Sequence, residues 1–153
     1  MKHKKNVLKG LFAAALLAMA TVPAMTFAAD NGGMAHAQAG KMKVIFQVSD
    51  ADPKKWNLTL NNAKNVQDAV GKDNVLLEIV AYGPGIGMLK FESDVGSRVK
   101  DAVDSGIKVV ACENTMKAQK IARSDMLPEV SFVGAGVVEL AQKQAEGYAY
   151  IRP

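Results

Sequence analysis

The stretch IKVVACENTM, residues 107–116, joins a short apolar run to the expected start of a helix. The run Ile107–Cys112 is largely β-branched and has the length of a buried strand, and Asn114 or Thr115 is suited to cap a helix that follows it. Four further runs of the same kind occur after residue 41: Val44–Val48, Val75–Tyr82, Val130–Val133 and Tyr148–Ile151. The sequence therefore predicts five short strands.

Amphipathic helices are predicted between these runs, because apolar residues recur there at three- and four-residue spacing. The repeats are Trp56, Leu60, Ala63, Val66 and Val70, then Val95, Val99, Ala102 and Val103, and finally Val137, Leu140, Ala141 and Ala145. Asp52 and Asp94 are predicted to cap the first two helices, and Gly71, Gly106 and Gly147 stand where helices should end. Alternating strands and helices imply right-handed βαβ units. The predicted fold is a three-layer α/β/α domain with a mainly parallel sheet.

The first 28 residues have the composition of a cleavable export signal. Four lysines and no acidic residue precede Asp30, the apolar stretch Leu11–Ala20 is short for a membrane span, and Thr26 and Ala28 suit a cleavage site. An uncleaved membrane anchor is the alternative, and the short apolar stretch disfavours it. We expect a soluble periplasmic protein without membrane contact after cleavage. Its parts are a signal at residues 1–28, a flexible leader at 29–41 and one folded domain at 42–153.

The charge of the chain depends on this signal. Four of the 19 basic residues lie within it, so 15 remain against 15 acidic residues, and the mature chain is close to neutral. No basic run with interleaved aromatic residues is left in the mature part. Nucleic acid is therefore not an expected partner.

Four predicted loops meet at the carboxyl edge of the sheet, where ligands of open α/β sheets bind. They are Ser49–Asp50, Gly83–Gly87, Cys112–Thr115 and Gly134–Gly136. The loop with Gly83, Gly85 and Gly87 has neither a complete dinucleotide fingerprint nor a phosphate-loop motif. It is interpreted either as a tight turn or as a close backbone approach to a small ligand or to the cysteine. The functional site is expected at this edge.

Cys112 is the only cysteine of the chain, and two interpretations of it stay open. A cysteine at the end of an apolar strand is often a small buried hydrophobe. A cysteine just before a helix is instead stabilised as a thiolate by the free N–H groups and partial positive charge of the helix start, although the neighbouring carboxylate of Glu113 acts against this. A single thiol in an exported protein forms no internal disulfide.

The last histidine of the chain is His36, which lies in the expected leader. A Cys–His or Ser–His–Asp nucleophile within the domain is therefore excluded. A zinc site of the Cys/His type is excluded in the same way, and we expect neither a metal nor a cofactor. A soft copper(I) site with Cys112 is conceivable from three methionines, but apolar lining explains them better. They are Met88, Met116 and Met126.

A family resemblance rests on the segments ACENTM (111–116), AGVVEL (135–140) and QAEGYAYI (144–151), with WNL (56–58) and GPG (83–85) also similar. They resemble the DsrE/DsrF-like sulfur-relay family, in particular its small single-chain branch, over Lys43–Pro153. The resemblance implies a five-stranded parallel sheet, assembly into trimers or hexamers, and a persulfide on Cys112. The best-known relatives are cytoplasmic and pass sulfur to tRNA-modifying machinery, which an exported protein does not reach. Without a second cysteine, any relay must run between different proteins.

These observations predict a periplasmic, oligomeric sulfur carrier with Cys112 as sulfur acceptor, rather than a classical turnover enzyme. Its partners would be copies of itself and an unidentified thiol or sulfur-donor protein. The residues expected around the sulfur are Gly83, Gly85, Gly87, Glu113, Asn114, Thr115, Gly134 and Gly136. The alternative is a non-catalytic small-ligand-binding or assembly protein in which Cys112 is a buried structural residue.

Overall fold

The computed structural model describes residues 40–153, so the expected signal and nearly all of the leader lie outside the described residues. The strands of this part are β1 (Met42–Val48), β2 (Val75–Ala81), β3 (Lys108–Cys112), β4 (Ser131–Val133) and β5 (Ala149–Ile151). Its helices are α1 (Pro53–Val70), α2 (Gly96–Asp104), α3 (Glu113–Ala118) and α4 (Gly136–Ala145), with 3-10 turns η1 (Lys72–Asn74), η2 (Gly83–Leu89) and η3 (Arg123–Asp125). None of the helices in residues 40–153 has the length and hydropathy needed to cross a bilayer.

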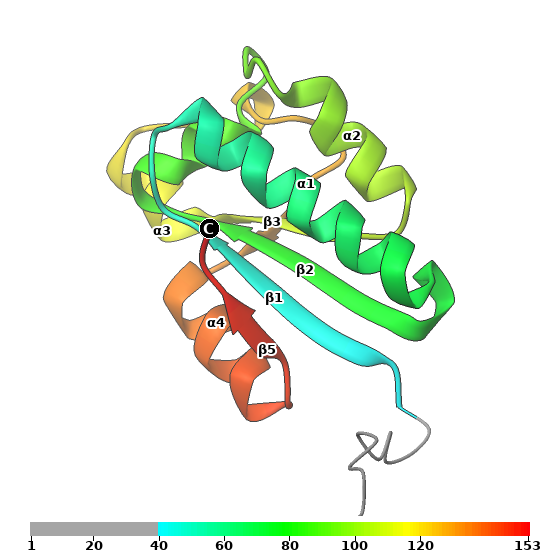
Figure 1. Ribbon diagram of the computed structural model, residues 1–153. Coiled ribbons are helices and arrows are strands. Elements are labelled where there is room, and N and C mark those ends of the chain that lie inside the picture. Colours follow the sequence, from blue (N-terminus) through cyan, green and yellow to red (C-terminus); the bar gives the residue numbers. More distant parts are fainter. Residues whose placement is uncertain (1–39) are drawn as a thin grey trace, which may run out of the picture. The chain divides into compact units, whose positions relative to one another are not determined.

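The strands form one sheet in the order β4-β3-β2-β1-β5, and every neighbouring pair is parallel. Helices α1 and α2 cover one face, and α4 crosses the other (Figure 1). From β1 to β4 the chain proceeds in one direction across the sheet. It then returns through α4 to place β5 on the other side of β1. The structure confirms the predicted three-layer α/β/α fold with its five-stranded parallel sheet.

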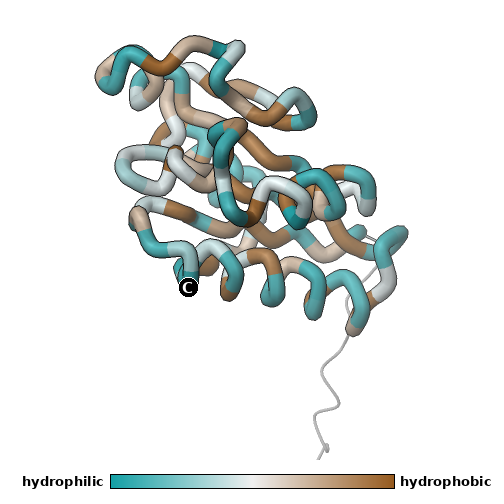
Figure 2. The backbone as a smooth tube through the Cα atoms, turned by 90° about the horizontal axis from the view of Figure 1, so that it is seen from above, coloured by the Kyte–Doolittle hydropathy of each residue, from teal (hydrophilic) through white to brown (hydrophobic). Residues whose placement is uncertain are grey.

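The two faces of the sheet bury apolar side chains to different extents. Beneath α1 and α2 lies a large core that includes Phe46, Trp56, Ile79, Met88 and Val99. On the other face the buried cluster consists of Ile45, Val80, Val110 and Leu140, with Tyr82, Val133 and Tyr148 at its margin. Figure 2 shows hydrophobic residues gathered along the strands and alternating with hydrophilic ones along the helices. The α4 face is therefore the thinly packed side of the domain.

The ends of the helices follow most of the predicted signals. The Asp52 side chain accepts the Lys54 N–H at 2.9 Å at the start of α1, and Gly71 ends that helix with a φ of 86°. The corresponding glycines after α2 and α4 also have positive φ. The predicted cap at Asp94 is wrong, because Val95 is the N-cap residue of α2 and no side chain caps it.

Helix α4 does not bury the apolar stripe that its sequence predicts. Leu140 is buried, but Val137 is 57% exposed, and the two alanines of the stripe are exposed as well. The least exposed positions of this helix are Gly136, Glu139, Leu140 and Lys143. The side of α4 that faces the sheet therefore combines the close contact of Gly136, the buried Leu140 and the ion pair of Glu139 with Lys108, and it differs from the predicted apolar stripe.

Candidate functional site

Three of the predicted loops come together at the carboxyl edge of the sheet, because β2, β3 and β4 run parallel and end there. The Gly83 N–H donates to the Thr115 hydroxyl oxygen at 2.9 Å, which ties η2 to α3. The Asn114 N–H donates to the Gly134 carbonyl oxygen at 3.1 Å, which ties α3 to the loop after β4. Cys112 is the last residue of β3 and lies where these loops meet.

The Cys112 side chain lies on the α4 face of the sheet and is 5% exposed. The Gly136 N–H, in the first turn of α4, donates to the Cys112 Sγ at 3.3 Å. This contact depends on glycine, because a Cβ at position 136 would lie 3.1 Å from the Tyr82 Cβ and 3.3 Å from the Cys112 Cβ. The thiol is therefore enclosed between the end of β3 and the start of α4.

Two opposing effects act on the pKa of the Cys112 thiol. Burial is the largest effect and raises this pKa. The Gly136 N–H donates to the sulfur, and the polar groups of the first turn of α3, which are the Thr115 hydroxyl and the backbone N–H groups of Asn114 and Thr115, also favour the charged form. Together these groups hold the pKa below its ordinary value of 9.0. The Asn114 N–H is also engaged by the Gly134 carbonyl, so Thr115 and Gly136 are the principal donors. The site therefore stabilises the thiolate more than the surroundings of an ordinary cysteine do.

The Thr115 hydroxyl is oriented by the loop after β2. Its oxygen accepts the Gly83 N–H, so its own proton is free to point at the Cys112 sulfur. Gln119, which the sequence does not single out, adds a second contact: its side-chain amide donates to the Gly83 carbonyl oxygen at 3.2 Å. The loop and α3 thus hold the hydroxyl between them.

Helix α3 begins earlier than predicted. Cys112 is its N-cap residue and Glu113 its first residue, so Asn114 and Thr115 lie inside the first turn, and the predicted cap at either residue is wrong. The Glu113 carboxylate forms an ion pair with Arg123. A guanidinium therefore offsets the charge that was expected to oppose thiolate formation.

Two glycines of η2 contact a strand and a helix rather than the thiol. A Cβ at Gly85 would lie 2.3 Å from the Val48 carbonyl oxygen, and one at Gly87 would lie 3.2 Å from the Trp56 ring. Gly83 has a φ of 53°, which glycine adopts readily and other residues rarely do. The Gly83–Gly87 loop therefore forms a tight turn and also brings its backbone into a close approach, but the elements that it approaches are β1 and α1 and not the cysteine.

The methionines considered as metal ligands lie on the opposite face of the sheet from the Cys112 sulfur. All three belong to the core beneath α1 and α2, as expected of apolar lining, and they are Met88, Met116 and Met126. Among the side chains of residues 40–153, no group of three or more His, Cys, Asp or Glu is arranged to hold a metal ion.

A hollow of about 380 Å³ opens beside the start of α4, and its lining includes Asn114, Gly134 and Val138. Two of the predicted site residues, Asn114 and Gly134, therefore border this open space. Another hollow, of about 300 Å³ between α1 and α2, contains none of the predicted site residues.

Fold and site together define a class of protein: a parallel five-stranded α/β/α domain with one thiol at the carboxyl edge of its sheet. The DsrE/DsrF-like family matches the chain over residues 42–153. The chain belongs to this family, as its sequence predicts. Membership of the family suggests a function of the sulfur-relay type.

Solved structures share this fold. A protein of unknown function, MTH1491 from Methanobacterium thermoautotrophicum, is 31% identical with a TM-score of 0.71, and the match covers 74% of this chain and 100% of that chain. BT1422 from Bacteroides thetaiotaomicron, of unknown function, is 16% identical with a TM-score of 0.59, over 72% of this chain and 94% of its own. The ychN protein from E. coli is 12% identical with a TM-score of 0.57, over 75% and 100%. The last two similarities show the fold alone. A comparison with curated proteins gave no match.

Proposed function

We propose that this protein is an exported sulfur carrier that holds sulfane sulfur as a persulfide on Cys112. The hydrogen bonding of the sulfur carries the proposal, because the Gly136 N–H and the Thr115 hydroxyl lower the thiol pKa in spite of burial. The thiolate is the form of cysteine that attacks a donor sulfur. Membership of the DsrE/DsrF-like family supports this chemistry.

Loading Cys112 in this way needs no base, no metal and no net oxidation. The thiolate attacks the outer sulfur of a donor persulfide, R–S–SH. A new S–S bond forms on Cys112 while the donor S–S bond breaks, and the donor leaves as the thiolate R–S⁻. Delivery reverses these steps: an acceptor thiolate takes the outer sulfur and Cys112 is released as a thiolate. Both steps involve a second molecule, because the chain has one cysteine.

The burial of Cys112 favours a second candidate function, a non-catalytic binding or assembly protein. At 5% exposure, the sulfur meets a donor only when the first turn of α4 or the loop after β4 moves. A structural cysteine needs no such movement. The hollow lined by Gly134 and Val138 gives a donor a place beside the moving segment. The two functions therefore differ in whether the native thiol reacts.

Sulfur uptake decides between them. Incubation of the protein with polysulfide, followed by removal of excess reagent, should add the mass of one sulfur atom, and mild reductant should remove it. Cys112→Ser is nearly isosteric and should fold as the wild type does, yet take up no sulfur. A wild-type thiol that alkylates in the native state but takes up no sulfur would exclude the carrier. A thiol that reacts with neither reagent until the protein is denatured would establish the structural cysteine.

We infer in addition that the protein is a homo-oligomer, a trimer or hexamer. Val137 and Val138 on α4 are 57% and 50% exposed, and Tyr150 and Ile151 on the neighbouring edge strand β5 are also exposed. Exposed apolar groups of this kind are typical of interaction surfaces. Light scattering at micromolar concentration should give a trimer or larger, and a strict monomer would contradict the inference.

Export is the third part of the proposal, and it is supported by the lysine-rich start and the short apolar stretch Leu11–Ala20. Intact-mass analysis of exported protein should show a chain that begins at Ala29. A soluble exported fraction that retains Met1–Ala28 would refute cleavage at this site.

A further inference from the structure

Helix α4 lies on the sheet through charged side chains as much as through apolar ones. Of the residues that it turns toward the sheet, Leu140 is the one side chain that belongs to the small buried cluster. Glu139 and Lys143, the other long side chains on this side, are charged and partly buried. Polar contacts therefore contribute much of what fixes the position of this helix.

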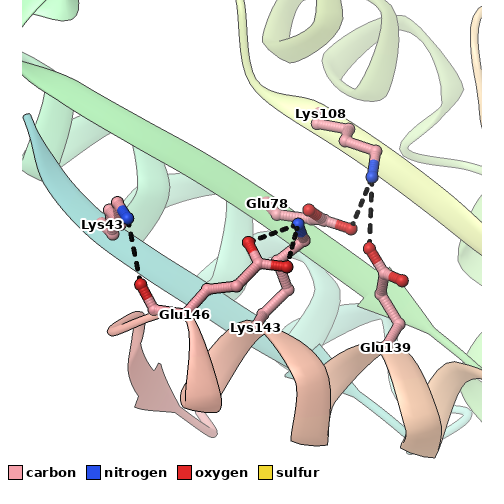
Figure 3. Close-up of polar contacts among 6 residues, drawn as sticks. All are labelled: Lys43, Glu78, Lys108, Glu139, Lys143 and Glu146. Carbon is pink, nitrogen blue, oxygen red and sulfur yellow. Dashed lines mark hydrogen bonds and ion pairs between the residues drawn. The ribbon is translucent and has the colours of Figure 1, made fainter.

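The charged contacts form a network between α4 and the strands beneath it (Figure 3). The Lys108 Nζ on β3 lies 3.1 Å from the Glu78 Oε1 on β2 and 3.2 Å from the Glu139 Oε1 on α4. The Glu78 side chain is 3% exposed and that of Glu139 is 14% exposed. Burial raises the pKa of Glu78, and the neighbouring carboxylate of Glu139 raises it further. These three side chains join α4 to two strands.

The far end of α4 has an anchor of its own. The Lys43 Nζ on β1 donates to the Glu146 carbonyl oxygen at 3.0 Å, and Lys143 pairs with the Glu146 carboxylate (Figure 3). Loss of the Lys108–Glu139 contact would therefore loosen the first half of the helix while its last turn stays attached to the sheet.

The network lies one helical turn from the thiol contact. Glu139 follows Gly136 by three residues, and the Gly136 N–H is the backbone donor from α4 to the Cys112 sulfur. The fit of this turn against the sheet is close, since a Cβ at Gly136 would already lie 3.2 Å from the Val80 side chain. A small outward movement of the turn removes the donor from the sulfur.

We propose that Lys108 and Glu139, with Glu78 beneath them, are positioning residues that hold the first turn of α4 against Cys112 and so set the reactivity of its thiol. The inference rests on the proposed function, in which Cys112 is the reacting group. The main effects on the pKa of Cys112 are burial and hydrogen bonds, so Lys108 and Glu139 act on the thiol through the position of α4.

The test compares Glu139→Ala with Glu139→Gln through the pH dependence of Cys112 alkylation by iodoacetamide. Alanine removes the partner of Lys108, and glutamine keeps an oxygen acceptor without the charge. Positioning predicts that the midpoint of the profile rises by about one pH unit in Glu139→Ala and returns most of the way in Glu139→Gln. The midpoint reports the thiol pKa: a shift of the first turn that lengthens the Gly136 N–H···Sγ contact while the sulfur stays covered removes a donor and keeps the effect of burial, so the pKa rises. Exposure of the sulfur to solvent would instead lower the pKa, and it would be seen as a higher plateau rate.

A direct electrostatic effect of the Glu139 carboxylate on the sulfur predicts a shift of the alkylation midpoint in the opposite direction. Removing a carboxylate near the sulfur would lower the thiol pKa, and it would do so in both Glu139 variants. A midpoint that falls or stays unchanged in Glu139→Ala overturns the proposal. Lys100→Ala is the matched control, because it breaks an exposed ion pair with Asp104 on α2 and should leave the midpoint unchanged.

A second variant covers the case in which Glu139→Ala does not fold. Lys108→Gln removes the charge of the same contact from the side of the sheet while it keeps a hydrogen-bond donor for Glu78, and amide hydrogen exchange then supplies the readout. Faster exchange in the first turn of α4, with β1 to β3 as in the wild type, supports the proposal, and unchanged exchange in α4 overturns it. Sulfur uptake is measured separately. A wild-type protein that takes up no sulfur refutes the carrier function and leaves the alkylation test intact.

Discussion

A Gly136→Ala variant tests the closest contact of the site. The added Cβ would lie 3.1 Å from the Tyr82 Cβ, 3.2 Å from the Val80 Cγ1 and 3.3 Å from the Cys112 Cβ. Carbon atoms in good contact are about 3.5–4.0 Å apart. Two of the three neighbours are Cβ atoms, one on Tyr82 directly after β2 and one on Cys112 at the end of β3, and neither can move without its backbone. The first turn of α4 must therefore move outward, and the Gly136 N–H moves with it.

The size of the effect follows from one lost hydrogen bond and one crowded contact. A hydrogen bond to a charged group contributes about 1.5–3 kcal/mol, and about 1.4 kcal/mol corresponds to one pKa unit. At the lower end, which suits a sulfur acceptor, the thiol pKa should rise by about one unit. Crowding costs about 1–3 kcal/mol, and alanine recovers about 0.5–1 kcal/mol of helix stability over glycine. The net loss of about 1 kcal/mol should lower Tm by roughly 4 °C.

The assay is the pH profile of Cys112 alkylation, together with a thermal melt. Gly134→Ala is the matched control in the same loop, because a Cβ there has no neighbour within 4 Å. It should titrate and melt as the wild type does. A Gly136→Ala protein with the wild-type midpoint would refute the conclusion that the N–H at this position stabilises the thiolate. An equal rise in both glycine variants would assign the effect to the loop in general.

Three further predictions concern the same edge of the sheet. Thr115→Val removes the hydroxyl donor and should raise the midpoint of the alkylation profile by about one pH unit. Thr115→Ser keeps a hydroxyl and should have the wild-type midpoint. An unchanged midpoint in the valine variant contradicts the role of the hydroxyl. The thiol pKa is lower in the folded protein than its ordinary value of 9.0, so the wild type should gain stability relative to Cys112→Ser as the pH rises from the folded pKa toward 9.0. The gain should disappear as the pH falls again. Urea denaturation measures this difference in the free energy of unfolding, and a difference that does not change with pH argues against the prediction. Gly85→Ala places a Cβ 2.3 Å from the Val48 carbonyl oxygen and should destabilise the domain by about 3 kcal/mol. A urea midpoint equal to that of the wild type would contradict this prediction, because it would mean that η2 moves to accommodate the added methyl group at little cost.

The strands are well predicted from the sequence because buried parallel strands are apolar on both faces. The run Val75–Tyr82 becomes a strand at Val75–Ala81, and Ile107–Cys112 becomes Lys108–Cys112. The edge position of the site follows from the topology alone, since parallel strands bring the loops after them to one side. The apolar pattern of a single segment is enough to identify each of these strands, and packing of the domain does not change that assignment.

The rotation of α4 is not predictable in the same way. Val137, Leu140 and Ala141 form an apolar repeat, yet the helix turns Gly136 and Glu139 toward the sheet. A glycine has no apolar signal, and its role depends on how close the helix comes to β2 and β3. An apolar face on the outside of a subunit is also what an oligomer would cover. Periodicity therefore identifies this helix without showing what it packs against.

One signal of the charged network is visible in the sequence. Glu78 interrupts the run VLLEIVAY, and a carboxylate in a buried strand needs a partner. The partner follows only from the register, in which Glu78 lies opposite Lys108 on the neighbouring strand. The third member, Glu139, comes from a helix on the α4 face and is 31 residues beyond Lys108. Long-range pairing of this kind appears only once the sheet is assembled.

The position of the thiol on the thinly packed face has a functional consequence. Sulfur exchange requires the Cys112 sulfur to be reached from outside, and opening the large core beneath α1 and α2 would cost much of the stability of the domain. On the α4 face, movement of one helical turn would break the Lys108–Glu139 contact and a few apolar contacts, and it would expose the sulfur. The same turn carries the Gly136 N–H, so opening it would remove a hydrogen bond that lowers the thiol pKa together with the burial that raises it. In the proposed carrier, the closed turn shields the sulfur from oxidants. A sulfur donor that binds beside α4 and replaces the lost hydrogen bond would gain access to the sulfur while the thiolate stays stabilised, which would favour transfer with a specific partner.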